Sequence, residues 1–355
     1  MNAYVKRDLY LNRLIVRRDN GQIKAVTGPR RSGKSFLLDP IYKDYLLSKC
    51  VPEDNIIIIS FDIEDEDTPQ ELLDREKLKE YLYSRIASQT ENYYVFLDEI
   101  QEVDGFERIV NGLNKRQNVD VYVTGSNSKF LSTEINTIFR GRSDEVSVLP
   151  FTFREFCQDR QESVNDLWKE YYTYGGLPAL RKMPTAEQKT TYLQKLWKKT
   201  YLDDVVERHN VENREALEAI ADALCSSIGF LTNTTRITNT LGSVRKIKIT
   251  DDTVAKYIGY LEEAFLFNEA RRYNIKGNKY YENIKKYYSI DVGLRNARLN
   301  YRQLEQTHLM ENIIFNELLY RGYVVDVGVV EHRKMVDGKS EYKQYEVDFI
   351  ATDGN

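Results

Sequence analysis

The sequence predicts an α/β protein that begins with a three-layer domain built on a five-stranded parallel sheet. Up to about residue 150, short apolar runs alternate with helical segments. The runs are rich in β-branched and aromatic residues, as expected of strands that are covered on both faces. Helical crossovers between successive strands favour parallel pairing. The predicted strands are 22–28, 55–62, 93–99, 120–126 and 145–150, and the predicted helices between them include 71–88 and 106–116.

This sheet domain is expected to span residues 1–155, and three further parts follow it. Residues 156–212 are mostly helical, with a long amphipathic stretch at 186–209, and form a predicted helical lid. Three helices and two strand-like runs around a Gly-Asn turn follow at 213–300, which is the outline of a winged helix. Residues 301–355 contain a helix and two strands, then an Asp-Gly turn without a following strand. We therefore expect the chain to stop inside a partial α/β domain.

Composition restricts the classes of protein that fit. With 355 residues, 41% hydrophobic and 30% charged, the chain has the composition of a soluble protein of several domains. No apolar run is long enough to span a bilayer and no secretion signal is visible, so we expect a cytoplasmic protein without a membrane partner. Three well-separated cysteines encode neither a disulfide framework nor a zinc ribbon. The net charge of −4 argues against general nucleic-acid coating but allows a local basic patch.

The stretch GPRRSGKS, residues 28–35, matches the phosphate-loop pattern G-x-x-x-x-G-K-S. It follows a predicted strand and opens a predicted helix, the setting in which backbone N–H groups and a helix N-terminus hold phosphates. We expect ATP and Mg²⁺ here, with Lys34 reaching the outer phosphates and Ser35 ligating the metal. The residues of this stretch expected to contact the nucleotide are Gly28, Arg30, Arg31, Ser32, Gly33, Lys34, Ser35 and Phe36.

Two more predicted strands end in polar residues. Asp98 and Glu99 follow the run YYVFL, at the strand end where ligands of open α/β sheets bind. We expect Asp98 to hold Mg²⁺ together with Ser35, and Glu99 to orient or deprotonate the water that attacks ATP and releases ADP and phosphate. In the run VYVTGSNS, Ser126 or Asn127 is expected to hydrogen-bond the γ-phosphate or the water, and a simple turn is the alternative.

Two arginines precede the fifth predicted strand in IFRGRSDEVSV. In a homo-oligomer, Arg140 or Arg142 could reach the γ-phosphate in a neighbouring subunit and stabilise charge in the transition state. The alternative is a surface arginine that pairs with Asp144 or Glu145.

Together, GPRRSGKS, FLDEIQ, VTGSNS, RGR with LPFTFREF, and YGGLPAL resemble the AAA-type ATPases of the archaeal-ATPase clade, which is related to the STAND regulatory NTPases. The resemblance covers essentially the whole chain. It implies a P-loop NTPase domain, a helical lid, a winged helix and a C-terminal domain of unknown function. Paired arginines are habitual in this clade, and Arg30 and Arg31 either contact phosphate or a neighbouring element or anchor the loop to acids such as Asp62 and Glu64. The GGLP stretch resembles the GxP element of the STAND group, which implies that Pro178 lies near the nucleotide base; a helix-breaking turn is the alternative.

The predicted winged helix is net basic. Between residues 244 and 290, ten lysines and arginines stand against six acids, and tyrosines interleave with the predicted wing. This composition suits contact with double-stranded DNA through its phosphates. The expected recognition helix, DDTVAKYIGYLEEAF, is however acidic and apolar, which disfavours base-specific reading. Domain packing or contact with a regulatory protein is the alternative use of this segment.

The closing segment resembles the start of a PD-(D/E)xK nuclease-like fold, as is reported for the terminal domain of this clade. The resemblance implies that Glu311 is the helix acid and Asp348 the strand acid that ligates metal. The third element, (E/Q)xK, would lie beyond Asn355, so an inactive fold is favoured over a nuclease.

These observations predict a Mg²⁺-dependent ATPase whose nucleotide cycle switches the relative position of the lid and the winged helix. Double-stranded DNA, a regulatory protein and a second copy of the chain are the candidate partners. One alternative is a nucleotide-gated regulatory module that hydrolyses ATP negligibly. The other is an ATP-dependent DNA-processing nuclease.

Overall fold

The structure is a computed structural model that describes residues 4–62, 69–125, 138–139, 141–277, 279–336 and 339–353. The chain divides into two compact units, Met1–Leu149 and Pro150–Asn355, which are described separately below. The finer division into four parts stays a prediction.

The first unit is built on a five-stranded sheet in which each pair of neighbouring strands is parallel. The strand order is β2-β3-β4-β1-β5, so the first strand of the chain lies inside the sheet. The strands are β1 (Ile23–Thr27), β2 (Ile56–Ser60), β3 (Tyr93–Asp98), β4 (Val119–Thr124) and β5 (Ser143–Ser147). This arrangement confirms the predicted α/β fold with a five-stranded parallel sheet.

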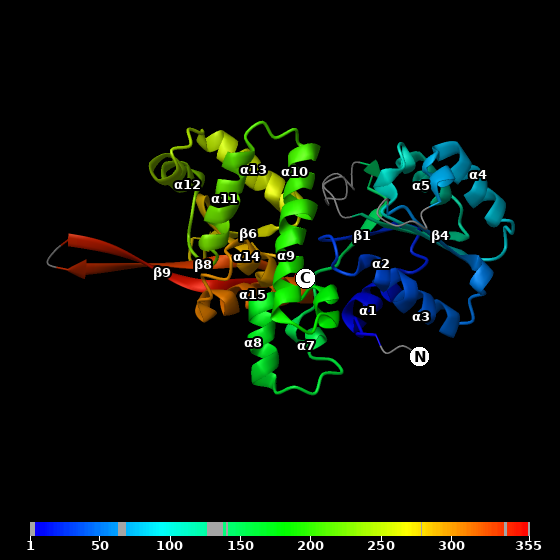
Figure 1. Ribbon diagram of the computed structural model, residues 1–355, viewed down its shortest axis with the longest axis horizontal. Helices are drawn as coiled ribbons and strands as arrows, with labels where there is room; N and C mark the ends of the chain where they lie inside the picture. The colour runs from blue at the N-terminus through cyan, green and yellow to red at the C-terminus, as the bar shows by residue number, and fades with distance from the viewer. Residues whose placement is uncertain are drawn as a thin grey trace. The chain divides into compact units, whose positions relative to one another are not determined.

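Helices cover both faces of this sheet (Figure 1). Because side chains alternate along a strand, Ala25 and Val123 pack with α4 and α5 on one face. On the other face, the ring centre of Tyr122 lies 5.1 Å from that of Tyr42 of η1. The helical elements of this unit are α1 (Asp8–Arg17), α2 (Lys34–Phe36), the π-helical η1 (Leu37–Tyr42), α3 (Lys43–Ser48), η2 (Glu53–Asn55), η3 (Gln70–Leu73), α4 (Arg75–Arg85), η4 (Ile100–Glu102) and α5 (Phe106–Leu113).

The second unit is mostly helical before residue 267. Its helical elements are α7 (Phe153–Phe156), α8 (Val164–Tyr174), η6 (Pro178–Lys182), α9 (Ala186–Lys195), the π-helical η7 (Leu196–Leu202), α10 (Asp203–Arg208), α11 (Arg214–Ser226), α12 (Thr234–Thr240), the π-helical η8 (Leu241–Arg245), α13 (Asp251–Glu263), α14 (Val292–Arg298) and α15 (Gln306–Arg321). The segments α9, η7 and α10 follow one another directly and confirm the long helical stretch predicted at 186–209. In the described part of the chain, no helix has both the length and the apolar character needed to cross a membrane.

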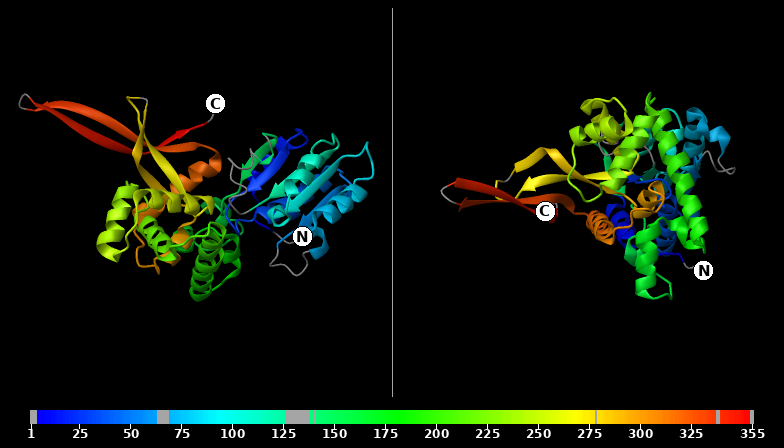
Figure 2. Two further views of the ribbon diagram at one scale, coloured as in Figure 1. Left: turned by 90° about the horizontal axis from the view of Figure 1, so that it is seen from above. Right: turned by 60° about the vertical axis from the view of Figure 1, so that its left-hand side comes forward.

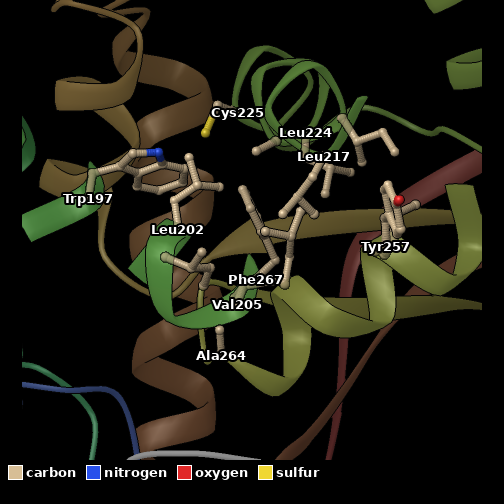
Figure 3. Packing of buried hydrophobic residues seen from close by; sticks show 14 of the residues in the cluster. Trp197, Leu202, Val205, Leu217, Leu224, Cys225, Tyr257, Ala264 and Phe267 are labelled. Atoms are coloured by element: carbon tan, nitrogen blue, oxygen red, sulfur yellow. The ribbon is translucent and has the colours of Figure 1, made fainter. Parts of the chain in front are cut away.

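One hydrophobic core joins the helical elements from η6 to α14 of the second unit (Figure 3). Trp197 and Leu202 of η7 pack in the same buried cluster as Leu217 of α11 and Tyr257 of α13. Phe267, at the start of β6, belongs to this cluster as well. The predicted lid and the three helices of the predicted winged helix therefore share their buried surface.

A second sheet, of four strands, completes this unit. The strands are β6 (Phe267–Asn274), β7 (Lys279–Ser289), β8 (Val324–Val336) and β9 (Lys339–Thr352), in the order β7-β6-β8-β9. Strands β8 and β9 form the long antiparallel hairpin drawn in red in Figure 2. Helices α11, α12 and α13 followed by the β6–β7 hairpin match the outline that suggested a winged helix. However, β6 also pairs in parallel with β8, so the hairpin is part of a larger sheet and the winged helix stays a prediction.

Candidate nucleotide-binding site

The phosphate loop connects the buried strand β1 to helix α2. Gly28 has φ +132°, and a Cβ at this position would lie 2.2 Å from the carbonyl oxygen of Val148, so only glycine fits. Gly33 has φ +92° and is the N-cap of α2, while Arg31 adopts φ +64° without being glycine. These left-handed residues curl the loop directly before the helix N-terminus. The glycines of the sequence pattern are therefore explained by backbone conformation and close packing.

Lys34 is buried inside the loop. Its side chain is only 3% exposed, and Nζ donates hydrogen bonds to the carbonyl oxygens of Gly28 and Pro29, each at 3.1 Å. The carboxylate of Glu99 lies 3.9 Å from the same ammonium group. Burial lowers the pKa of Lys34 despite the opposing charges of Glu99 and Asp98. A phosphate anion in the loop would compensate for the lost hydration of this ammonium group.

Asp98 collects hydroxyl groups from three elements. Its Oδ1 accepts hydrogen bonds from Ser35 Oγ of α2 at 2.9 Å and from Thr124 Oγ1 of β4 at 2.6 Å. Its Oδ2 lies 3.5 Å from Ser60 Oγ at the end of β2. Burial raises the pKa of Asp98, against the hydrogen bond from Thr124. A carboxylate beside a serine hydroxyl is a hard oxygen donor set that fits Mg²⁺.

Glu99 is held in a special backbone conformation next to Asp98. It has φ +50° and ψ +42°, and its N–H donates to Thr124 Oγ1 at 2.9 Å. Its Oε2 accepts a hydrogen bond of 2.6 Å from Gln101 Nε2. A non-glycine residue in the left-handed region at a strand end is uncommon and is a feature of functional sites. The strand end therefore presents Glu99 in a defined orientation.

Sequence reasoning missed Thr124 and Gln101. Thr124 donates to Asp98 and accepts from the amide of Glu99, so one hydroxyl orients both acids. The interpretation of VYVTGSNS placed the functional hydroxyl at Ser126 or Asn127, which lie outside the described residues. Thr124 is the last residue of β4, beside β3 in the sheet, and its position at a strand end could have pointed to it.

The other loop residues that were expected to contact the nucleotide differ in how far they are buried. Ser32 is fully buried, while Arg31 is exposed and Arg30 is half-buried near Lys34. Phe36 is 48% exposed. The roles of these four residues in nucleotide contact stay predictions, and Glu64, considered as an anchor of the loop, lies outside the described residues.

Arg142 is exposed on the segment before β5, and Arg140 lies outside the described residues. The acids suggested as alternative partners have other contacts. Asp144 pairs with Arg17 at 2.7 Å, and Glu145 accepts a hydrogen bond of 2.6 Å from Thr27 Oγ1. A role of Arg142 at the nucleotide of a second subunit stays a prediction.

The GGLP stretch belongs to the second unit, and Pro178 is the first residue of η6. The amide of Gly176 donates to Asp291 Oδ2 at 2.7 Å, and its carbonyl accepts from the amide of Phe151 at 2.8 Å. Burial raises the pKa of Asp291 to about 6. The stretch is therefore a tightly packed turn in this unit, and the proximity of Pro178 to a nucleotide base stays a prediction.

The two predicted nuclease-like acids lie around a buried lysine of the same unit. Lys286 Nζ of β7 is 2.9 Å from Glu311 Oε1, 2.7 Å from Glu346 Oε1 and 4.0 Å from Asp348 Oδ1. Tyr288 Oη also donates to Glu311, at 2.6 Å. Although burial opposes the charge, the hydrogen bonds to Glu346 and Glu311 raise the pKa of Lys286. Glu311 and Asp348 are thus brought together, but around an ammonium group.

The chain is similar to known proteins both as a whole and in its parts. A model of the AAA domain matches residues 20–157, which include the loop, Asp98 and Glu99. A domain of unknown function, DUF8612, matches residues 165–305. An uncharacterized protein of Haemophilus influenzae is 35% identical over 354 residues, which cover 98% of this chain and 84% of that protein.

The chain belongs to the same family as that protein and carries an AAA domain. The uncharacterized protein MJ1544 of Methanocaldococcus jannaschii is 28% identical to this chain over 342 residues. The matched region covers 93% of this chain and 72% of MJ1544. The structure is similar to the Walker-type ATPase PABY2304 of Pyrococcus abyssi, with a TM-score of 0.57 and 16% identity. That match covers 83% of the AAA protein and 96% of the solved chain, and it bears on the fold alone.

Proposed function

We propose that the protein binds ATP with Mg²⁺ in the phosphate loop and hydrolyses it to ADP and phosphate. The observation that carries this proposal is the hydrogen-bonded group of Ser35, Asp98, Thr124 and Glu99 beside the buried Lys34. These residues come from the ends of two neighbouring parallel strands, β3 and β4, and from helix α2 after the loop. Ligands of open α/β sheets bind at such strand ends.

Each side chain has a separate task in this proposal. Lys34 binds the outer phosphates, and Ser35 and Asp98 hold the metal ion. When bound there, Mg²⁺ would supply positive charge that offsets the negative charge of the phosphates. Glu99 orients the attacking water and accepts its proton, while Gln101 and Thr124 keep its carboxylate and backbone in place.

Substitution of Glu99 by glutamine tests the catalytic part. The E99Q protein should bind ATP but turn it over at a rate lower by about two orders of magnitude or more, since removal of a general base commonly costs that much. Glu107→Gln, on helix α5, is a matched control and should hydrolyse ATP at the wild-type rate. Undiminished hydrolysis by E99Q would remove Glu99 from the mechanism.

Substitution of Lys34 tests the binding part. A Lys34→Ala protein should lose its affinity for labelled ATP, because the ammonium group is buried within the loop, beside the carbonyl oxygens of Gly28 and Pro29. Retention of ATP by that variant would refute a phosphate site at this loop. Wild-type protein that retains ATP without turnover would instead support a nucleotide-gated regulatory module.

We further propose that the nucleotide cycle drives a conformational switch in the second unit. The predicted lid helices and the helices of the predicted winged helix share one core (Figure 3). This shared core disfavours the expected change in their relative position and favours movement of the two together. Separating them would expose buried Leu and Trp side chains at about 25 cal/mol per Å² of apolar surface. Comparison of proteolytic cleavage patterns with ADP and with ATP would reveal the segments that change.

Double-stranded DNA receives less support as a partner. Of the ten basic residues counted in the predicted winged helix, Lys286 and Arg272 are buried, and Lys285 and Arg245 each form an ion pair within the unit. These contacts reduce the charge that is free to follow a phosphate backbone. ATP hydrolysis measured with and without double-stranded DNA tests this partner, and an unchanged rate would remove DNA from the proposal.

A further inference from the structure

Arg7 binds the backbone of the phosphate loop. It precedes helix α1, and the residue is 2% exposed. One terminal nitrogen donates to the carbonyl oxygen of Ser32 at 2.9 Å, and the other donates to the carbonyl oxygen of Leu149 at 2.8 Å. The guanidinium carbon lies 4.5 Å from the centre of the Tyr10 ring. A long cation is therefore fixed in one orientation at a buried position.

The contact with Ser32 determines the direction of an amide group of the loop. A trans peptide is planar, so the carbonyl of Ser32 and the N–H of Gly33 point in opposite directions. Because Arg7 binds that carbonyl, the N–H of Gly33 is directed away from Arg7. Gly33 is the N-cap of α2, and backbone N–H groups at such a position are the donors that bind phosphate.

The residues on either side of Ser32 could adopt other backbone conformations, which would rotate the peptide between Ser32 and Gly33. Arg31 and Gly33, on either side of Ser32, have φ values of +64° and +92°. A glycine reaches other backbone regions at little cost, and a left-handed arginine gains energy by leaving that region. A fixed hydrogen bond to the carbonyl between them therefore opposes rotation of the peptide.

Arg7 and Tyr10 also bind the backbone of Leu149, which follows the residue that packs against the loop. Tyr10 Oη accepts a hydrogen bond of 2.9 Å from the amide of Leu149, while Arg7 binds the carbonyl of that residue. The amide of Val148 donates to Thr27 at 2.8 Å, and the Val148 carbonyl lies against Gly28. Arg7 thus connects the loop with the segment beneath it.

We propose that Arg7 is a positioning residue for the nucleotide: by binding the Ser32 carbonyl, it keeps the Gly33 amide directed at the phosphates. This inference rests on the proposed binding of ATP in the loop. Arg7 lies before the first predicted strand and acts through the backbone.

The experiment compares two arginines that attach α1 to the rest of the first unit. Arg7→Ala removes the contact with Ser32, while Arg17→Ala removes the ion pair with Asp144 of β5 at the other end of α1. Affinity for MgATP is measured by titration with a fluorescent ATP analogue, and thermal unfolding is measured in parallel. Arg7→Ala should weaken binding about ten- to hundredfold, the range that loss of a charge-assisted hydrogen bond produces. Arg17→Ala should change binding less than about twofold.

Two further measurements separate positioning from general stability. Addition of ethylguanidinium to the Arg7→Ala protein should recover part of the lost affinity, because the free cation can occupy the emptied position. Arg7→Lys, which keeps the charge and one donor direction, should bind MgATP with intermediate affinity and serves if the alanine variant does not fold.

The outcomes distinguish this inference from the proposed function. Unchanged affinity in both Arg7 variants overturns the inference, as does an equal loss of affinity in the Arg17 variant. Wild-type protein that does not bind MgATP overturns the proposed function, and the inference with it. Loss in the Arg7 variants alone, with recovery by ethylguanidinium, supports both.

Discussion

Substitution of Lys286 by methionine tests whether the second unit depends on a buried cation. Methionine keeps most of the apolar side chain but leaves Glu311 and Glu346 without the ammonium group. Lys286 is 2% exposed and Glu311 13%, so water replaces the lost contacts poorly. Glu346 is 33% exposed and Asp348 68%, so these two carboxylates contribute less to the cost.

The structure sets the size of the expected effect. Breaking a buried ion pair from one side costs about 3–5 kcal/mol, and the partial exposure of Glu346 places this case at the lower end, about 3 kcal/mol. Lys285 is the adjacent residue on β7, and its side chain points to the other face of the strand. It pairs with Glu269 at 2.6 Å, where the two side chains are 31% and 25% exposed. Lys285→Met should therefore cost less than about 1 kcal/mol.

Urea unfolding followed by tryptophan fluorescence measures this difference directly. The chain has two tryptophans, Trp168 and Trp197, and both belong to the second unit, so the signal reports on that unit alone. The double variant K286M/E311Q also removes the unpaired Glu311 carboxylate. Its free energy of unfolding should exceed that of K286M by at least about 1 kcal/mol. Equal stability of the Lys286 and Lys285 variants would refute the reasoning, since it would mean that burial does not determine the cost.

Three smaller predictions follow from the same structure. Gly28→Ala should destabilise the first unit by at least about 2 kcal/mol and abolish ATP binding, because φ is +132° and the new Cβ would overlap the Val148 carbonyl; circular dichroism melting and ATP titration check this. Gly259→Ala, in α13, should raise the stability of the second unit by about 0.5–1 kcal/mol, because its Cβ would meet no atom within 4 Å; no gain in the urea midpoint would contradict it. Burial, with added repulsion from Glu269, raises the pKa of Glu262 from 4.5 to about 8, so the folded state keeps a proton that the unfolded chain releases and stability falls as pH rises from 4.5 to 8. Glu262→Gln should flatten this dependence and exceed wild-type stability at pH 9, and parallel stability curves would argue against a buried neutral carboxyl.

The strands and the loop were predictable because their causes are local. A run such as IIIIS in β2 is apolar because both faces of the sheet are covered, and the run itself carries that information. The loop is recognisable because Gly28 and Gly33 adopt backbone conformations that other residues avoid. Asp98 and Glu99 follow a buried strand, and their place at the sheet edge follows from the parallel topology.

The missed residues act across long stretches of sequence. Thr124 reaches Asp98 because β4 lies beside β3, and the order of strands in a sheet is not written in any single run. Arg7 binds backbone carbonyl groups, which carry no side-chain signal at all. Likewise, the parallel pairing of Arg272 with Val327 joins β6 to β8, a strand that follows α14 and α15 in the sequence. A hairpin that was predicted as a separate wing is therefore part of a larger sheet.

The turn at Gly176 bears on how the protein should be cut for separate study. Its carbonyl binds the amide of Phe151, and the carbonyl of Phe151 in turn accepts a hydrogen bond from Tyr171 Oη at 2.7 Å. The match to the domain of unknown function starts at residue 165. An expression fragment that began there would lack Phe151 and would leave the Gly176 carbonyl and the Tyr171 hydroxyl without these hydrogen bonds. A fragment that begins at Pro150 retains them and is the better starting material for crystallisation or NMR.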